Sequence, residues 1–335
     1  MIISQTPYRV SFAGGGTDLP AFYRQEYGAV LSMAIDKHMY VTVSPRFESS
    51  TRVAYTKVEI VDMVAQLQHE LVREALKLTD LGRHLEVTTV GDVPSGTGMG
   101  SSSSLTVGVL LALHAYKGQI VSAKNVAEQA CRIELNALGK PIGKQDQYAA
   151  AFGGLNYIRF NPDDSVDVEP VPAPPETMQE LSSRLMLLYT DKQRDADSIL
   201  KRQSEGTKDR MPILRAMRDL AHEMRLALGG GGGLDEFARL LHQGWELKRS
   251  LGFGISMEKV DAWYEQARKL GAQGGKLLGA GGGGFLLLIA PTERHERIRQ
   301  ALGHPRELTL RIDRRGGRII FISDHQRLLH NQRDP

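Results

Sequence analysis

Cysteine is almost absent from this chain of 335 residues. The single residue Cys131 excludes an intramolecular disulfide framework and a cysteine-rich metal site, and it fits a reducing compartment. Long apolar runs are missing as well, since a stretch such as 109–113 is far too short to span a bilayer, and residues 1–9 lack the pattern of a secretory signal. We therefore expect a cytoplasmic protein that does not insert into a membrane.

An excess of charge of one sign is also absent. The 42 Lys and Arg residues stand against 39 Asp and Glu residues, which gives a formal net charge of +3, and no long basic run is interleaved with aromatics. The charge pattern therefore gives little support for nucleic-acid binding. The 10 histidines show no metal-ligand spacing and no G-x-S-x-G sequence occurs, which argues against a zinc enzyme and an α/β-hydrolase.

Chain length and apolar spacing predict two domains of mixed α and β structure. A chain of 335 residues is long for one domain and short for three. The spacing predicts strands near 1–13, 39–43 and 85–89 and helices near 60–78, 105–116 and 122–138, the last of them with Ser122 as N-cap. Prolines 170, 172, 174 and 175 mark a linker, so we place one domain at residues 1–175 and the other at 176–335.

A stretch rich in glycine and serine, Pro94–Ser104, lies between an expected strand and an expected helix. Glycines let backbone N–H groups approach an anion, and the N-terminus of the following helix adds partial positive charge. A flexible linker is the alternative for such a composition, but linkers do not normally join a strand to an apolar-faced helix. We favour phosphate binding, although the stretch is neither a G-x-x-x-x-G-K-[ST] loop nor a dinucleotide fingerprint.

Three glycine-rich blocks in this order resemble the GHMP kinases, the superfamily of galactokinase, homoserine kinase, mevalonate kinase and phosphomevalonate kinase. The blocks are Pro7–Asp18, Pro94–Ser104 and Lys276–Phe285, so the resemblance spans nearly the whole chain. It implies an α+β two-domain fold with a left-handed β-α-β crossover in the N-terminal domain, a ferredoxin-like C-terminal domain and an active site between them. Ala13–Pro20 and Lys276–Gly284 are most similar to the D-glycero-D-manno-heptose 7-phosphate kinases, with the fucokinases as the nearest competitors.

By this resemblance the second block wraps the phosphates of ATP. Its nucleotide-binding residues are Pro94, Ser95, Gly96, Thr97, Gly98, Met99, Gly100, Ser101, Ser102 and Ser103. Ser102 and Glu134 would hold Mg²⁺, for which hydroxyl and carboxylate oxygens are suitable ligands. A glutamate on the flank of a helix usually faces solvent or pairs with a lysine, but Glu134 lies beside the apolar stripe of its helix, which favours the metal.

Asp146 resembles the aspartate of the Asp-Gln pair in galactokinases and related sugar kinases. The resemblance makes it the base that accepts the proton of the acceptor hydroxyl. An anomeric hydroxyl is more acidic than an ordinary alcohol, so a carboxylate is a sufficient base. Arg9 would stabilise the γ-phosphate or act on Asp146. The alternatives are a turn or capping role for Asp146 and a structural salt bridge for Arg9.

A third set of residues would bind the sugar. The substrate residues are Gly15, Gly16, Thr17, Asp18, Lys144, Arg194, Gly281 and Gly282. By the resemblance Asp18 accepts hydrogen bonds from sugar hydroxyls, although an aspartate after three glycines can also end a turn. A phosphate at the far end of the sugar would need cations. Arg194 is the first choice for that role, and Lys140, Lys144, Lys192 and Arg24 are the other candidates.

The expected reaction moves the γ-phosphate of ATP to the anomeric hydroxyl of D-glycero-D-manno-heptose 7-phosphate. The 1,7-bisphosphate would then enter nucleotide-activated heptose synthesis for surface polysaccharide. One alternative is a 1-kinase for an unphosphorylated sugar such as fucose. An alternative of another class is a non-catalytic sugar sensor, which the joint presence of Ser102, Glu134 and Asp146 disfavours. The expected partners are a sugar phosphate and ATP, without nucleic acid or membrane, and the sequence leaves a homodimer open.

Overall fold

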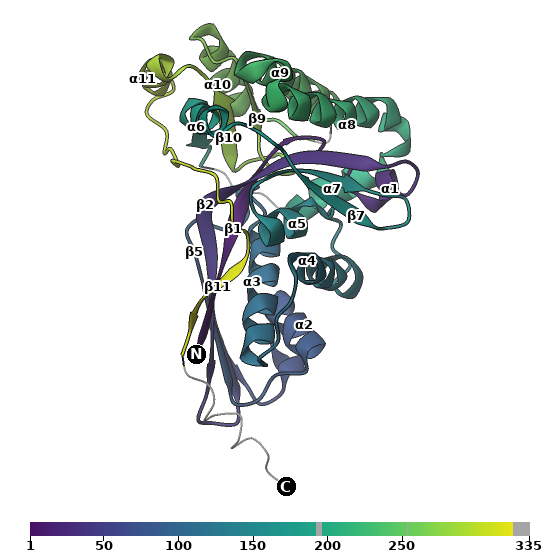
Figure 1. The fold of residues 1–335 in the computed structure, drawn as a ribbon, viewed down its shortest axis with the longest axis vertical. Coiled ribbons are helices and arrows are strands. Elements are labelled where there is room, and N and C mark those ends of the chain that lie inside the picture. Colours follow the sequence, from purple (N-terminus) through teal and green to yellow (C-terminus); the bar gives the residue numbers. More distant parts are fainter. Residues whose placement is uncertain (192–195, 253, 324–335) are drawn as a thin grey trace.

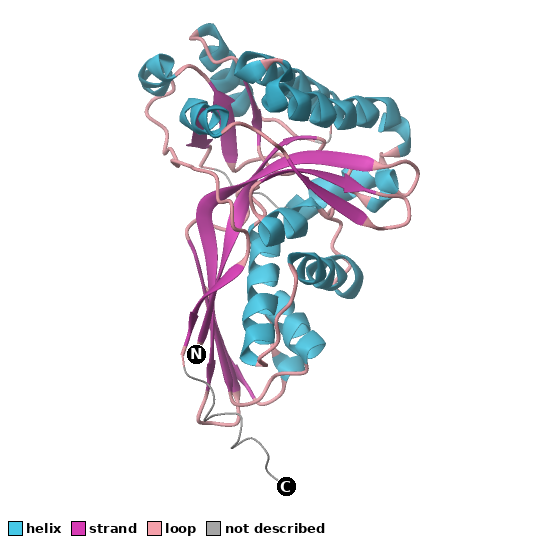
Figure 2. Cartoon of the chain, viewed as in Figure 1, coloured by secondary structure: helices cyan, strands magenta, loops and turns pink. Residues whose placement is uncertain are grey.

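Two β-sheets with helices packed against them make up the computed structural model, which describes residues 1–191, 196–252 and 254–323. Within these ranges the larger sheet has 8 strands and the smaller has 3. The large sheet is long and twisted and carries helices along one side, whereas the small sheet lies with further helices at the other end of the molecule (Figure 2). The expected α+β fold in two domains is therefore confirmed.

The first half of the chain supplies most of the large sheet. Its elements are β1 (Ile2–Ala13), α1 (Pro20–Tyr23), β2 (Gly28–Pro45), β3 (Thr51–Ala54), β4 (Val58–Val61), η1 (Val64–Gln66), α2 (Glu70–Thr79), β5 (Leu85–Gly91), α3 (Ser101–Tyr116), α4 (Ala123–Cys131), η2 (Arg132–Ala137), α5 (Gln145–Phe152), β6 (Leu155–Phe160) and β7 (Val166–Pro170). The strand order is β11-β1-β2-β5-β3-β4, with β6 pairing to β2 and β7 to β6.

Strand β1 connects the two parts of the molecule. Every residue of β1 from Thr6 to Ala13 is buried, as expected for a strand that is covered on both faces. Helix α3 contacts β1 from the first half of the chain, while α8 and α9 contact it from the second half. The turn that follows Ala13 therefore lies between the two parts of the molecule.

The second half of the chain forms the small sheet and its helices. Its elements are α6 (Pro175–Arg184), β8 (Leu185–Tyr189), α7 (Ala196–Glu205), η3 (Lys208–Arg210), α8 (Met211–Leu226), η4 (Ala227–Gly231), α9 (Gly233–Ser250), α10 (Glu258–Lys269), β9 (Gly274–Leu277), β10 (Phe285–Ile289), α11 (Thr292–Ala301) and β11 (Arg318–Ile322). The antiparallel order is β8-β10-β9, and an isolated bridge between Leu188 and Glu307 continues the sheet beyond β8.

The last strand crosses back to the first sheet. Strand β11 pairs antiparallel with β1, with Ile2 opposite Ile322. Figure 1 shows β11 beside the start of β1, far from α8 and α9. The domain boundary at residue 175 stays a prediction, and residues 318–322 from the second half of the chain belong to the first sheet.

One expected helix is wrong in its first part. The apolar spacing predicted a single helix over 60–78, but Val58–Val61 forms β4 and α2 begins at Glu70. Ile60 is exposed and lies in β4, a strand at the edge of the large sheet. Its apolar side chain is therefore not part of a buried helical face. The helix expected over 122–138 does form. Ser122 caps it by accepting a hydrogen bond from the Asn125 N–H, and it continues beyond Cys131 as the π-helix η2.

Candidate active site

The glycine-serine stretch turns sharply between β5 and α3. Gly96, Gly98 and Gly100 have φ of 75°, 79° and 76°, backbone conformations that favour glycine. Gly100 is the N-cap of α3, which runs for 16 residues from Ser101. The loop is anchored to the sheet because the Arg9 N–H donates to the carbonyl oxygen of Met99 at 3.1 Å. Glycine backbone and a helix N-terminus are together suited to bind phosphate.

The third glycine-rich block packs directly against this loop. A Cβ added to Gly98 would stand 2.7 Å from the carbonyl oxygen of Leu278, and one added to Gly279 would stand 2.5 Å from the Cα of Gly98. A Cβ on Gly284 would stand 2.3 Å from the carbonyl oxygen of Thr97. Only glycine permits backbones to approach this closely. The two blocks therefore form one structural unit across the two halves of the chain.

Glu134 is fully buried beneath the start of α3. Its carboxylate accepts hydrogen bonds from the Ser102 hydroxyl, from the Ser103 hydroxyl at 2.8 Å and from the Gln147 side-chain amide at 2.6 Å. Burial raises the pKa of Glu134, although these hydrogen bonds act in the opposite direction. No Lys, Arg or His of the described residues forms an ion pair with this carboxylate. The Glu134 carboxylate is therefore buried with neutral donors only, and no cation of the described residues balances its charge.

Asp146 and Arg9 form an ion pair at the mouth of the loop. The Arg9 Nε donates to the Asp146 carboxylate at 2.7 Å, and its terminal nitrogen donates to the Gly98 carbonyl oxygen at 2.6 Å. Arg9 is 4% exposed, so its guanidinium is fixed by these contacts. Asp146 lies in the first turn of α5, and a Cβ added to Gly100 would stand 3.2 Å from its carboxylate. The carboxylate thus lies directly beside the phosphate-binding loop.

Asp18 lies on the other side of the same cavity. Its carboxylate accepts hydrogen bonds from the Gly16 N–H at 2.9 Å and from the Gln145 side-chain amide at 2.9 Å. Gly143 is required beside it, because a Cβ there would stand 1.9 Å from the carboxylate. Burial raises the pKa of Asp18 above its ordinary value. Since Gln145 precedes Asp146, the two aspartates are tied to the same end of α5.

Most of these groups line one cavity of about 620 Å³ between the two halves of the chain; Glu134 does not line it, but it is hydrogen-bonded to Ser102 and Ser103, which do. The residues already described that line it are Arg9, Gly15, Gly16, Asp18, Ser95, Gly96, Gly98, Gly100, Ser101, Ser102, Ser103, Lys140, Gly143, Gln145, Asp146 and Gly279. The structure therefore brings together the predicted catalytic pair, the Asp18 turn and most of the glycine-serine stretch. Of the ten predicted nucleotide-binding residues, Pro94, Thr97 and Met99 do not line the cavity, and Thr97 and Met99 are buried.

Two buried lysines that sequence reasoning did not single out also line this cavity. Lys248 and Lys276 are 8% and 5% exposed. Lys248 lies on α9, and Trp245 of the same helix is buried as well. Lys276 begins the third glycine-rich block, so its position in the sequence could have indicated that it lies at the site. The sequence around Lys248 carries no local signal of burial.

The remaining predicted substrate residues lie elsewhere. Lys144 donates to the Asp164 carboxylate at 3.2 Å and stacks over the Tyr23 ring, in an adjoining cavity of about 530 Å³. Gly282 donates its N–H to the Ile255 carbonyl oxygen at 2.9 Å, and Gly281 packs against the same residue. The Thr17 hydroxyl bonds to the carbonyl oxygens of Gly14 and Ala29, inside the turn. Arg194 and Lys192 lie outside the described residues.

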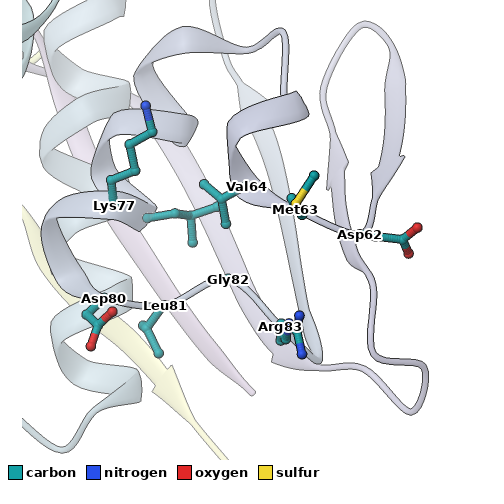
Figure 3. A pocket seen from close by; sticks show the side chains of 9 residues that line it. Asp62, Met63, Val64, Lys77, Asp80, Leu81, Gly82 and Arg83 are labelled. Carbon is teal, nitrogen blue, oxygen red and sulfur yellow. The ribbon is translucent and has the colours of Figure 1, made fainter.

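A further hollow of about 430 Å³ lies between η1, α2 and the turn before β5. Figure 3 shows its lining, which includes Asp62, Lys77, Asp80 and Arg83. All four of these charged residues are exposed. Because exposed charges are well solvated, this hollow offers none of the buried polar chemistry of the cavity between the halves.

The described ranges contain neither a cluster of metal-ligating side chains nor a membrane-spanning helix. Within 1–191, 196–252 and 254–323, no group of three or more His, Cys, Asp or Glu side chains could hold a metal ion. No helix in these ranges is long and apolar enough to cross a membrane.

Comparison with known proteins agrees with this geometry. The sequence pattern of the GHMP kinases N terminal domain matches residues 56–154, and that of the GHMP kinases C terminal matches residues 214–305. A crystal structure described as a D-glycero-D-manno-heptose 1-phosphate kinase from Bacteriodes thetaiotaomicron superposes with a TM-score of 0.79 and 26% identity, covering 97% of this chain and 100% of that one.

Several relatives in sequence are sugar kinases by name. The D-glycero-alpha-D-manno-heptose 7-phosphate kinase of Campylobacter jejuni is 30% identical over 89% of this chain and 92% of its own length. The galactokinase of Pyrococcus furiosus is 26% identical over 90% of this chain and 92% of its own. The bifunctional fucokinase/GDP-fucose pyrophosphorylase of Arabidopsis thaliana is 27% identical over 92% of this chain and 32% of its own. As its three glycine-rich blocks predict, the chain belongs to the GHMP kinases and is a phosphotransferase.

Proposed function

We propose that this kinase transfers the γ-phosphate of ATP to the anomeric hydroxyl of D-glycero-D-manno-heptose 7-phosphate. The observation that carries the proposal is the position of Asp146. Its carboxylate lies beside Gly100 of the phosphate-binding loop, is held by Arg9 at 2.7 Å and follows Gln145, which bonds Asp18. A base in this position is within reach of both a bound triphosphate and a sugar in the Asp18 turn.

The glycine-serine loop would bind the triphosphate of ATP. Its glycines and the N-terminus of α3 supply backbone N–H groups and partial positive charge. Ser102 and Glu134 would hold Mg²⁺, because the Glu134 carboxylate is buried, accepts only neutral donors and has no cation partner in the described ranges. Bound Mg²⁺ would neutralise charge on the phosphate oxygens.

The transfer itself needs a proton acceptor and little further covalent chemistry from the protein. Asp146 would take the proton of the anomeric hydroxyl as that oxygen attacks the γ-phosphorus. The new bond joins the sugar oxygen to phosphorus, and the bond between phosphorus and the bridging oxygen breaks, so ADP leaves with the electron pair. Arg9 holds the carboxylate toward the loop and adds positive charge where the phosphoryl group passes.

The choice of a phosphorylated sugar rests on the adjoining cavity. That cavity shares Leu19, Lys140 and Ile142 with the active-site cavity. Its cationic lining residues are Arg24, Arg132, Lys140 and Lys144. A substrate that extends from Asp146 toward these cations would place its far end among phosphate-binding groups. The kinase from Campylobacter jejuni, named for a heptose 7-phosphate, supports the same choice. Three of these cations also pair with carboxylates, Arg24 and Lys144 with Asp164 and Lys140 with Glu70.

The test is ADP release from MgATP with heptose 7-phosphate, unphosphorylated heptose and fucose measured side by side. Asp146→Asn serves as the control protein, since it keeps the shape of the side chain and removes the base. We expect turnover of the 7-phosphate far above the other two sugars, and little with Asp146→Asn. Preferred turnover of fucose would overturn the heptose assignment but leave the kinase intact. Sugar binding without turnover by the unaltered protein would support the sensor instead.

A further inference from the structure

Two lysines that the proposed reaction does not use lie in the wall of the active-site cavity. The Lys248 ammonium donates hydrogen bonds to the carbonyl oxygens of Leu277 at 3.1 Å and Gly279 at 2.5 Å. The Lys276 ammonium donates to the carbonyl oxygen of Phe12 at 3.0 Å. Neither lysine forms an ion pair with a carboxylate of the described residues. Both are more than nine-tenths buried, where an unpaired charge is costly.

The charges around these lysines add to that cost. Burial and the charge of Arg9 lower the pKa of Lys248 to about 7. Burial, then Lys248 and Arg9, lower the pKa of Lys276 well below its ordinary value. Among these three cations only Arg9 has a carboxylate partner, Asp146. Lys248 and Lys276 thus lack a carboxylate partner among the described residues, and a bound anion would favour their protonated forms.

A serine hydroxyl of the cavity lacks a hydrogen-bond partner. The Ser11 hydroxyl is buried, lines the same cavity and has no hydrogen-bond partner among the described residues. Ser11 lies one residue before Phe12, whose carbonyl oxygen binds Lys276. One cavity is therefore lined by a hydroxyl without a hydrogen-bond partner and by two ammonium groups whose hydrogen-bond acceptors are neutral carbonyl oxygens.

We infer that Lys248 and Lys276 form a phosphate-binding pair for the terminal phosphate of the nucleotide, contributed by the second half of the chain. The inference rests on the proposed nucleotide site and not on the identity of the sugar. Its ligand is a phosphate group, for which the sugar's own phosphate is the second source. The position of Lys248 favours the nucleotide.

That position follows from the packing of the two glycine-rich blocks. Lys248 bonds the carbonyl oxygen of Gly279, whose backbone abuts Gly98 of the phosphate-binding loop. Arg9 bonds the carbonyl oxygen of the same Gly98 and holds Asp146. The pair is therefore tied to the segment where a phosphoryl group would pass from ATP to the base. The cations suited to a sugar phosphate lie instead in the adjoining cavity.

The experiment compares the binding of ADP and of AMPPNP, a non-hydrolysable ATP analogue, in the presence of Mg²⁺. Isothermal calorimetry would be carried out on the whole protein and on Lys248→Met and Lys276→Met, which keep the length of the side chain without its charge. Lys269→Met, on the exposed face of α10, is the control. We expect each cavity variant to bind AMPPNP at least about tenfold more weakly and ADP within about threefold of the parent.

Proton uptake provides a second readout on the unaltered protein. The charges that interact with Lys248 are those of Arg9 from β1 and Lys276 from β9, and Arg9 is itself paired with Asp146 from α5. A terminal phosphate beside Lys248 would raise its pKa, so a proton should be taken up on binding at pH 8. Calorimetry in buffers of different ionisation enthalpy should detect uptake with AMPPNP but not with ADP, and less uptake in Lys248→Met.

Each other result of the calorimetry would contradict either the nucleotide site or the role of the two lysines. If ADP itself fails to bind, the proposed nucleotide site is wrong. If ADP and AMPPNP weaken equally in both variants, or neither changes, the lysines have a structural role and the inference falls. If the ratio of the two nucleotides is unchanged but heptose 7-phosphate binds more weakly, the phosphate is the sugar's own. If a variant fails to fold, the proton uptake of the unaltered protein still tests the inference. Equal uptake on binding ADP and AMPPNP would overturn it.

Discussion

The Asp146 carboxylate lies against Gly100, so that a Cβ at Gly100 would stand 3.2 Å from it. Gly100 also has a φ of 76°, in the left-handed region. A Gly100→Ala variant should therefore strain the loop and displace the base together. We expect a loss in kcat/KM of about 100-fold or more, because small misplacements of a reacting group are costly. Steady-state assay of ADP release measures the loss.

Gly118 provides a matched control for this variant. It has a φ of 70°, close to that of Gly100, but a Cβ there would have no neighbour within 4 Å. Gly118→Ala should lower the thermal midpoint about as much as Gly100→Ala, since the backbone strain of about 1–2 kcal/mol is the same. It should leave kcat/KM unchanged. Equal kinetic losses in both variants would contradict the placement of Asp146 beside the loop.

Glu134→Gln should weaken Mg²⁺-dependent nucleotide binding without lowering the stability of the metal-free protein. Burial raises the pKa of Glu134, so ionisation costs the folded state free energy as pH rises above the ordinary value near 4.5. The neutral amide removes this cost, and we expect a metal-free thermal midpoint equal to or above that of the parent at pH 8. The variant should nonetheless lose Mg²⁺-dependent AMPPNP binding by about tenfold or more.

The matched control is Glu176→Gln on α6, where the glutamate is exposed. It should change neither the metal-free midpoint nor the Mg²⁺ dependence of AMPPNP binding. If Glu134→Gln keeps full Mg²⁺-dependent binding, Glu134 does not hold the metal. A large fall in its metal-free midpoint would show that the carboxylate stabilises the fold.

The buried charge of Lys248 should be visible in the pH dependence of stability. Its pKa is lowered from 10.5 to about 7 in the folded protein. Between these pH values the unfolded chain binds a proton that the folded protein lacks, so the free energy of unfolding rises with pH in that window. Lys248→Met should therefore be more stable than the parent near pH 7, by about 1–4 kcal/mol, and the difference should shrink toward pH 10.

Urea unfolding of both proteins at several pH values measures this difference. Lys269→Met, with its exposed side chain, should track the parent at every pH. A Lys248→Met protein that is markedly less stable at pH 7 would mean that the two hydrogen bonds from Lys248 to Leu277 and Gly279 outweigh the cost of burying the charge.

Recognition of a sugar phosphate should depend on the adjoining cavity. Lys144→Met should raise the KM for heptose 7-phosphate by about tenfold and leave the KM for unphosphorylated heptose within about twofold. The reason is that its ammonium, held beside Asp164 and Tyr23, would contact the far phosphate and not the reacting hydroxyl. Lys57→Met, exposed in the turn between β3 and β4, is the control. Equal changes with both sugars would contradict the proposal.

The sequence predicted the site better than it predicted individual elements. The order of the three glycine-rich blocks led to the cavity that holds Arg9, Asp18 and Asp146, because glycines at close backbone contacts leave a signal that survives in the sequence. Apolar spacing failed at Ile60, since it cannot distinguish an exposed edge strand from the start of a helix.

What the sequence could not show was contact between distant segments. Lys248 appears on a helix with charged neighbours, and its burial depends on the packing of α9 against β9 and on Gly279. In the same way, Glu134 receives hydrogen bonds from Ser102 and Ser103 more than 30 residues away. Such tertiary contacts override local pattern, and only the folded structure reveals them.

The ³¹P NMR spectrum of a reaction with MgATP and heptose 7-phosphate shows directly which hydroxyl is phosphorylated. We expect one new phosphate signal that couples to the anomeric proton, appears together with ADP and is absent with Asp146→Asn. A new signal coupled to any other sugar proton, or ADP formed without a new sugar phosphate, would contradict the proposed reaction.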